Sequence, residues 1–266
     1  MIIPPALLFA AKLSLVAASV WLASLVARRF GHRAGGVLAG MPMIAAPITG
    51  LLLIDVPSPA VRAVCLATLA CQPALMAYFV AFARAAARWP WWACLVFALA
   101  VFFAVGALLL ALPLPEPVRI ALALSSPFLG ALAMPHYATA VPAAAAGGKA
   151  SQPRVELALR SGVAVAVAAG VMWGATHLGP GPAGLLLAMP ITGIVLPAFT
   201  LPRHGAAAAA TLLAGFVRGQ AGFVIFFVLM LALLPSLHAA VGWPLAMLAS
   251  GLLPWLWLRL RRPSAG

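Results

Sequence analysis

Acidic residues are nearly absent from this chain. Its 266 residues include three Asp or Glu against 16 Lys or Arg, and charged residues make up only 7% of the sequence. A soluble domain carries about 25% charged residues, so this chain has too few charged residues to form the polar surface of a soluble protein. The 65% hydrophobic content and the mean hydropathy of +1.14 predict an integral membrane protein with no separate soluble domain.

The shortage of catalytic and metal-binding motifs narrows the function further. The sequence has no P-loop, GxSxG, HExxH or HxxxH motif. Its three cysteines have no CxxC spacing, which argues against a zinc site or a disulfide framework. The acids Asp55, Glu116 and Glu156 lie near the ends of apolar segments, so we expect no proton relay of deep carboxylates. We therefore expect no metal, no cofactor and no nucleic acid partner, and we favour a protein that is not an enzyme.

Apolar segments long enough to cross a bilayer recur along the whole chain. A spanning helix needs about 20 apolar residues, and nine stretches satisfy this condition. The period-2 alternation that marks membrane β-strands is absent from them. The sequence therefore predicts an all-α polytopic membrane protein with spans at roughly residues 5–27, 34–55, 60–83, 90–112, 118–140, 155–176, 183–202, 205–234 and 239–258.

The basic residues give these spans an orientation. Cytoplasmic loops are enriched in Lys and Arg, and the two arginines of the predicted outer loops, Arg62 and Arg119, each lie near an acid. We expect the N-terminus outside and the C-terminus inside a bacterial inner membrane. The cytoplasmic segments then contain eleven of the 16 basic residues, namely Arg28, Arg29, Arg33, Arg84, Arg88, Lys149, Arg154, Arg203, Arg259, Arg261 and Arg262.

Residues that apolar helices rarely carry recur at an offset of 148 positions. Self-similarity at a fixed period indicates repeat architecture, and coincidence of such residues is more informative than matched Ala and Leu. The coinciding pairs are Lys12 with Arg160, Gly31 with Gly179, Gly36 with Gly184, Met41-Pro42 with Met189-Pro190, and Gln72 with Gln220.

This offset predicts an inverted repeat. Spans one to four match spans six to nine, and equivalent positions are separated by five spans, so the two copies insert in opposite senses. The predicted 4+1+4 architecture has repeat 1 at residues 1–112, a connector span at 113–148 and inverted repeat 2 at 149–266. Inverted repeats are typical of secondary transporters, although a duplication retained only for packing gives the same pattern.

Three basic residues lie within predicted spans in addition to Arg62 and Arg119, which lie at the outer ends of theirs. An ionisable group inside the bilayer marks a functional site by default. Arg218 is the deepest, about 20 Å from the inner end of its span at 1.5 Å per residue, and either binds an anion or caps carbonyls of a broken helix. Lys12 and Arg160 occupy equivalent positions. Each also has a simpler interpretation, because Lys12 can extend towards the outer interface and Arg160 can pair with Glu156.

Two further equivalent pairs point to a binding site between the repeats. Gln72 and Gln220 either tie helices together through hydrogen bonds or bind a polar ligand. Met41-Pro42 and Met189-Pro190 interrupt spans two and seven, because proline removes a helical hydrogen bond. Matched interrupted helices in the two halves mark the binding site of many transporters, and a half-helix beginning there favours anions. Ordinary proline kinks remain the alternative.

Two resemblances accompany these patterns. The stretch from Arg28 to Asp55, a basic loop followed by an apolar helix with Gly and Pro, resembles the small GlpM-like bacterial membrane proteins. That resemblance covers a small part of the chain and implies no defined activity. The layout as a whole resembles the inverted-repeat secondary carriers.

The sequence thus predicts a transporter that moves a small anionic or acid-bearing substrate by alternating access. Its expected partners are the lipid bilayer and that substrate. The sequence is also compatible with a homo-oligomer. The predicted substrate-binding residues are Arg218, Gln220, Gln72, Lys12, Arg160, Met41, Pro42, Met189 and Pro190. The alternatives are a membrane-embedded enzyme or flippase acting on a phosphate-bearing lipid, and a membrane scaffold subunit.

Overall fold

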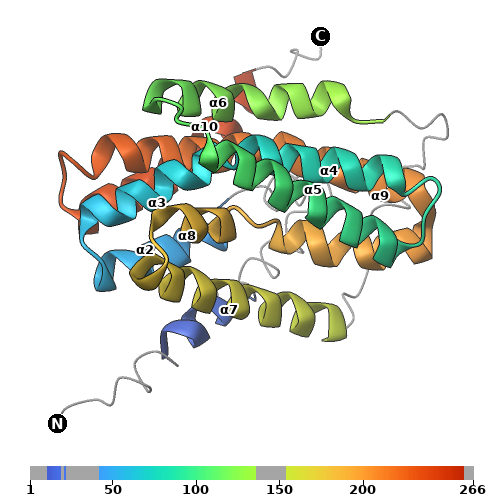
Figure 1. Ribbon diagram of the computed structural model, residues 1–266, viewed down its shortest axis with the longest axis horizontal. Helices are drawn as coiled ribbons and strands as arrows, with labels where there is room; N and C mark the ends of the chain where they lie inside the picture. Colours follow the sequence, from blue (N-terminus) through green and yellow to red (C-terminus); the bar gives the residue numbers. More distant parts are fainter. Residues whose placement is uncertain (1–10, 19–20, 22–41, 136–153, 261–266) are drawn as a thin grey trace.

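A computed structural model describes residues 11–18, 21, 42–135 and 154–260 (Figure 1). These residues form helices joined by short turns, and the described part contains no strand. Four helical segments are long and apolar enough to cross a membrane: Ser58–Ala85, Trp91–Ala111, Leu157–His177 and Pro180–Leu233. Two shorter apolar helices, Ala45–Asp55 and Ala239–Leu252, accompany them. The protein is therefore an all-helical protein built of membrane-compatible helices.

From residue 45 to 133, and again from residue 154 to 260, the helices follow one another with few intervening residues. Residues 11–18 are helical and precede the labelled elements. The labelled helices are α2 (Ala45–Asp55), α3 (Ser58–Ala70), α4 (Gln72–Ala85), α5 (Trp91–Ala111), α6 (Glu116–Ala133), α7 (Arg154–His177), α8 (Pro180–Leu187), α9 (Ile191–Leu233) and α10 (Ala239–Leu260).

Proline sets many of the helix starts. Pro57, Pro90, Pro115 and Pro190 are the N-cap residues of α3, α5, α6 and α9. The fixed φ of proline suits the entry to a helix, and the N–H that proline lacks would have no partner there. The turns that precede these four helices are short.

The long helix α9 contains a reversal. Gly205 has φ 79° inside it, a left-handed conformation that glycine adopts without steric cost. Thr192 before the break and Gln220 after it line one cavity, although a straight helix would place them about 42 Å apart at 1.5 Å per residue. Residues 191–204 and 206–233 are therefore two helices that fold back on each other at Gly205.

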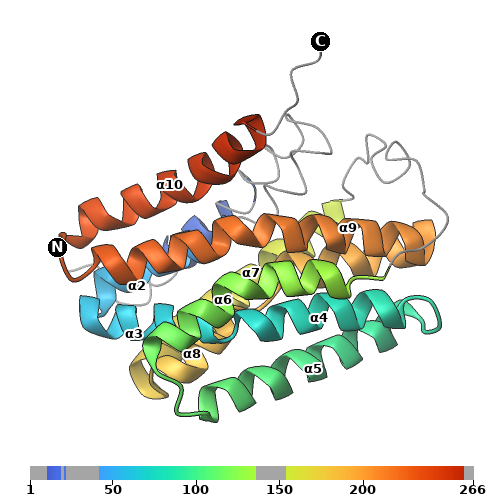
Figure 2. The same ribbon diagram turned by 90° about the horizontal axis from the view of Figure 1, so that it is seen from above.

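The helices pack around α3, α4 and α9. Helix α4 contacts α5, α6 and α9, whereas α3 contacts α6, α8 and α9. Helix α8 contacts α7, and α10 packs against α9. Seen from above, α5 and α10 lie on opposite outer sides with α9 and α4 between them (Figure 2). The other helices thus surround a centre made by α3, α4 and α9.

Helix boundaries recur at the 148-residue offset. Ser58 and Ala85, the ends of the α3–α4 segment, correspond to Ala206 and Leu233 in α9, which ends at Leu233. Trp91, the first residue of α5, corresponds to Ala239, the first residue of α10. The turn before α3 at Pro57 corresponds to the reversal at Gly205.

The segments 58–85 and 206–233 run antiparallel. Arg62 Nε donates to the Leu231 carbonyl at 3.3 Å. Further along, Gln72 contacts Gln220, and the Phe79 ring lies 6.0 Å from the Phe216 ring. Residue numbers rise along α3–α4 while those of their partners fall along α9, so equivalent segments of the chain point in opposite directions.

The predicted spans agree with this fold in part. Every predicted span from residue 60 onward overlaps a described helix, and span seven is divided between α8 and the first part of α9. Helix α6 and the described part of α10 do not belong to the four long apolar segments. The count of nine spans, the orientation and the repeat boundaries stay predictions.

Candidate functional site

Gln72 and Gln220 meet at the centre of the molecule. Gln72 Nε2 donates to Gln220 Oε1 at 3.2 Å, and both side chains are buried. The pair joins the first turn of α4 to the second half of α9. Gln72 Oε1 is buried without a hydrogen-bond partner among the described residues. A buried polar atom that lacks a partner calls for an explanation, such as an unseen water or ligand.

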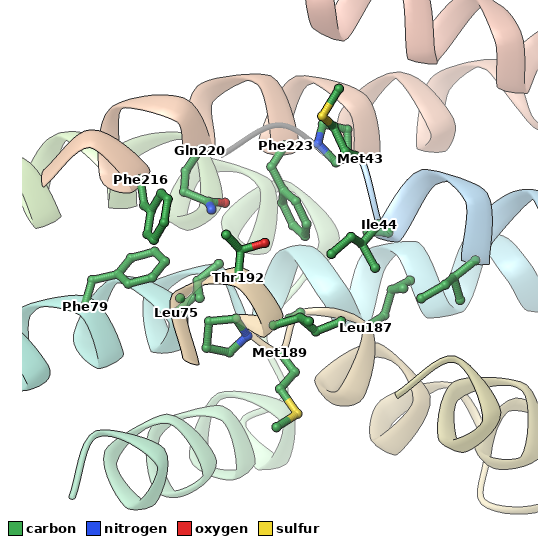
Figure 3. A pocket seen from close by; sticks show the side chains of 17 residues that line it. Met43, Ile44, Leu75, Phe79, Leu187, Met189, Thr192, Phe216, Gln220 and Phe223 are labelled. Carbon is green, nitrogen blue, oxygen red and sulfur yellow. The ribbon is translucent and has the colours of Figure 1, made fainter. Parts of the chain in front are cut away.

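A cavity of about 60 Å³ lies beside this pair (Figure 3). Gln220 and Phe223 enter it from the second half of α9, Thr192 from the start of α9, and Ile44 from the residues before α2. None of its lining residues carries a charge. The lining consists of Pro42, Met43, Ile44, Ala45, Ile48, Leu75, Phe79, Leu187, Ala188, Met189, Pro190, Ile191, Thr192, Gly193, Phe216, Gln220 and Phe223.

Most of this lining comes from positions that the offset makes equivalent. The segment 42–45 lines one part of the cavity, and its equivalent, 190–193, lines another. Leu75 and its equivalent Phe223 also line the cavity. The two halves of the chain therefore contribute matching segments to one space, with Gln72 and Gln220 beside it.

The helical structure is interrupted at Met189-Pro190, where the sequence predicts that a half-helix begins. Helix α8 ends at Leu187, residues 188–190 are not helical, and α9 begins at Ile191. Ile194 N donates to the Pro190 carbonyl at 2.7 Å. The first N–H groups of a helix have no partner within it, and they carry its positive dipole end. Thr192 and Gly193 lie in this first turn and line the cavity.

The same geometry occurs after Pro42. Ala46 N donates to the Pro42 carbonyl at 2.7 Å, the equivalent of the bond at Pro190. Helix α2 then begins at Ala45. Two helices thus start at the cavity shortly after equivalent prolines, α9 directly after Pro190 and α2 three residues after Pro42. Met41 and the rest of predicted span two before it lie outside the described residues, so the break of that span is described only from Pro42 onward.

Two close contacts position the start of α9. Tyr78 Oη donates to the Gly193 carbonyl at 2.9 Å, with both groups buried. A Cβ on Gly193 would lie 2.6 Å from Phe79 Cε1, so only glycine permits this approach. On the other side of the break, a Cβ on Gly184 would lie 2.8 Å from Thr68 N. Helices α8 and α9 are therefore both packed tightly against the α3–α4 segment.

Lys12 lies away from the cavity. Its Nζ forms an ion pair with Asp55 at the end of α2. The side chain of Lys12 is 10% exposed and that of Asp55 is 32% exposed. Lys12 has no acid in its own predicted span, and the structure pairs it with Asp55 at the end of α2. Asp55 therefore neutralises this lysine, which does not line the cavity.

Arg218 also lies outside the cavity. Its side chain is exposed on α9, whereas Gln220, two residues further, is buried and lines the cavity. Residues two apart on a helix project in nearly opposite directions, which separates the two. Arg218 makes no ion pair with any residue the structure describes. Arg160 belongs to α7, but its side chain lies outside the described part.

Sequence reasoning missed several residues of the lining. Thr192 follows Pro190 by two positions and is the one hydroxyl in the lining; it stands within a motif that the sequence did single out. Phe79 and Phe216 line the cavity from α4 and α9. Nothing in an apolar helix of this composition distinguishes a cavity-lining phenylalanine from a lipid-facing one.

The described residues offer no metal site, and no similar known protein is found. No group of three or more His, Cys, Asp or Glu that could hold a metal ion occurs among the residues searched, which are the described ones. Comparisons of the chain with protein-family models, curated proteins and solved structures find no match.

Proposed function

We propose that the protein is a membrane transporter that moves a small anionic or acid-bearing solute by alternating access between two inverted repeats. One observation carries the proposal. Gln72 contacts Gln220, its own equivalent at the 148-residue offset, beside a cavity lined by equivalent segments of both halves. Substrate sites of inverted-repeat transporters lie at the repeat interface, near discontinuous helices.

When two copies of a unit are related by a two-fold axis, a residue can contact its own equivalent only near that axis. The antiparallel course of 58–85 and 206–233 supports an axis perpendicular to these helices, as an inverted repeat requires. We place this axis in the membrane plane, with four spans in each repeat and one connecting span. Exchange of conformations between the halves would then open the cavity to either side.

The cavity chemistry supports an anion or an acid. Its lining contains no carboxylate, and the Gln220 amide nitrogen is a hydrogen-bond donor in the lining. Helix N-termini favour negative charge. The unpartnered Gln72 Oε1 adds an acceptor beside the cavity, which suits a solute that also carries a donor, such as the hydroxyl of an acid. We assign binding to Gln220, Thr192 and the turns after Pro42 and Pro190.

The cavity volume limits the solute in this conformation. One water occupies about 10–15 Å³ measured in this way, so about 60 Å³ accommodates a few non-hydrogen atoms. Monatomic anions, nitrate, formate and acetate have the appropriate size. The surrounding apolar helices favour a location in a lipid membrane, and the positive-inside pattern favours a bacterial inner membrane with the N-terminus outside.

Thermal unfolding of the purified protein with a panel of small anions tests the binding site. A ligand at about a hundred times its Kd stabilises the folded state by about 2.7 kcal/mol. We expect a selective rise in Tm in the wild type that is lost in Gln220→Leu. Arg218→Ala is the matched control, because it removes a side chain of the same helix that lies outside the cavity, and we expect it to retain the rise.

Flux of the selected anion into proteoliposomes tests transport itself. We expect uptake in the wild type and none in Gln220→Leu, with normal insertion of both proteins. A Tm rise that persists in Gln220→Leu would overturn the assignment of the cavity. Loss of the rise in Arg218→Ala alone would place the anion at Arg218. Binding without flux would reject transport and leave a binding protein.

A further inference from the structure

A second site lies at the α4–α5 turn, far from the central cavity. A groove of about 480 Å³ runs along one face of α4 and reaches α5. In Figure 1 this turn lies at the opposite end of the molecule from the start of α3. Its lining includes Arg84, Arg88 and Trp89 together with apolar residues. The central cavity shares no residue with it.

The two arginines line the groove from the end of α4 and from the turn that follows it. Arg84 lies in the last turn of α4, Arg88 lies three residues beyond the end of this helix at Ala85, and both are exposed. Two positive charges that line one groove repel each other, and an anion bound between them offsets that repulsion. Arg84 Nη2 donates to the carbonyl of Ala133 at the end of α6 at 3.0 Å, which holds its guanidinium in place. A guanidinium has five N–H donors, so most of them stay available.

No acid whose side chain the structure describes forms an ion pair with either arginine. Asp55 is paired with Lys12, and Glu116 lies 2.5 Å from Arg62. Those two ion pairs involve helix ends far from the α4–α5 turn. The Arg84–Arg88 groove is therefore a positive site without an internal counter-ion among the residues described.

The floor of the groove is apolar. Ala77, Val80 and Ala81 form it along α4, and Phe97 lines it from α5. The Trp89 ring packs edge-on against Phe97, with centroids 5.2 Å apart, and both rings are partly exposed. Tryptophan is typical of the membrane interface, where its ring lies at headgroup depth. A topology signal needs positive charge in a loop but does not need this apolar floor.

We infer that this groove binds an anionic phospholipid of the leaflet that faces the α4–α5 turn. The phosphate lies between Arg84 and Arg88, because guanidinium groups bind phosphate oxygens in pairs. The glycerol lies against Trp89, and one acyl chain follows the small residues of α4. Basic pockets between membrane helices bind anionic headgroups in this way. A soluble phosphate compound would gain nothing from the apolar floor.

Native mass spectrometry of the full-length protein in detergent tests the inference. The probes are phosphatidylglycerol and phosphatidylcholine with identical acyl chains, and soluble glycerol 3-phosphate is added as a competitor. We expect tighter binding of phosphatidylglycerol and no competition. Removal of each arginine should weaken that binding by roughly fivefold, so Arg84→Ala/Arg88→Ala should weaken it by roughly 25-fold. Arg84→Lys/Arg88→Lys keeps the charge but not the paired hydrogen bonds, and should lie between.

Arg203→Ala is the matched control. Arg203 is exposed on α9, stacks on Phe199 and does not line the groove, so its removal should leave phosphatidylglycerol binding unchanged. Equal affinity for the two lipids would overturn the inference, as would equal losses in Arg203→Ala and the double alanine variant. Competition by glycerol 3-phosphate would indicate that the groove binds a soluble phosphate compound and not a lipid. If the double alanine variant does not fold, the lysine variant and the comparison of the two lipids in the wild type still test the inference.

Discussion

Gln72 Nε2 donates a hydrogen bond to Gln220 Oε1 at 3.2 Å, and the two residues are 148 positions apart, the offset at which the chain repeats its unusual residues. This contact relates a pattern in the sequence to a position in space. It brings the first turn of α4 against the second half of α9 beside the central cavity.

The first prediction concerns the glutamine pair. Gln72→Leu and Gln220→Leu each leave a buried amide without its partner, so each should lower the free energy of unfolding by about 1–3 kcal/mol. The double variant removes both amides and should cost less than the sum of the singles. The coupling should be about 0.5–3 kcal/mol, measured by denaturant unfolding in detergent. Additive effects would mean that the two side chains do not interact.

The second prediction concerns the packing of α8 on α3. A Cβ at Gly184 would lie 2.5 Å from Ala67 Cβ and 2.8 Å from Thr68 N. Neither atom can move without the helix, so Gly184→Ala should destabilise the protein by about 1–3 kcal/mol or more. Gly162→Ala is the control, because nothing lies within 4 Å of its Cβ. That change should stabilise α7 by about 0.5–1 kcal/mol. Equal Tm values for the two variants would contradict the close approach.

The third prediction concerns the hydroxyl that holds the start of α9. Tyr78→Phe removes the bond to the buried Gly193 carbonyl and should lower the free energy of unfolding by about 0.5–1.5 kcal/mol. Because Gly193 lines the cavity, the variant should also bind the transported anion more weakly. Thr200→Val removes a hydroxyl that bonds within α9, to the Leu196 carbonyl at 2.8 Å. This control should leave anion affinity unchanged, and a comparable loss there would show that any loosening of α9 suffices.

The fourth prediction concerns the Lys12–Asp55 ion pair. Lys12→Met or Asp55→Leu leaves one charge alone in an apolar setting, which costs about 3–5 kcal/mol for a fully buried pair and less here because Asp55 is partly exposed. The double variant should regain most of the stability, as measured by Tm. Neither residue lines the cavity, so anion-induced stabilisation should survive in the double variant. Loss of this stabilisation in the double variant would indicate that Lys12 takes part in anion binding.

Much of the helical framework follows from the sequence. Apolar runs of about 20 residues specify membrane helices without knowledge of their neighbours. The break at Met189-Pro190 was also predictable, because proline interrupts a helix through its own ring. The repeat identified Gln72 and Gln220 as equivalent residues. Equivalent residues approach each other only near a two-fold axis, and the structure shows that these two are in contact.

The site predicted from charge alone differs from the cavity that the structure describes. Arg218 and Gln220 are neighbours in sequence, but the helical period directs them to different sides of α9. The acid that neutralises Lys12 belongs to another helix, so inspection of one span could not identify it. The prediction that Arg218 binds the substrate remains to be tested, and the Arg218→Ala control addresses it.

The sequence by itself determined the local properties of this protein: apolar composition, helix lengths, proline breaks and the 148-residue offset. These depend on neighbours along the chain, through backbone hydrogen bonding and the cost of polar groups in lipid. The tertiary structure decided which helix faces meet. It selected Gln220 over Arg218 for the cavity and paired Lys12 with Asp55, and it placed Arg84 and Arg88 beside an apolar groove. Those outcomes depend on packing between distant segments, which no single helix encodes.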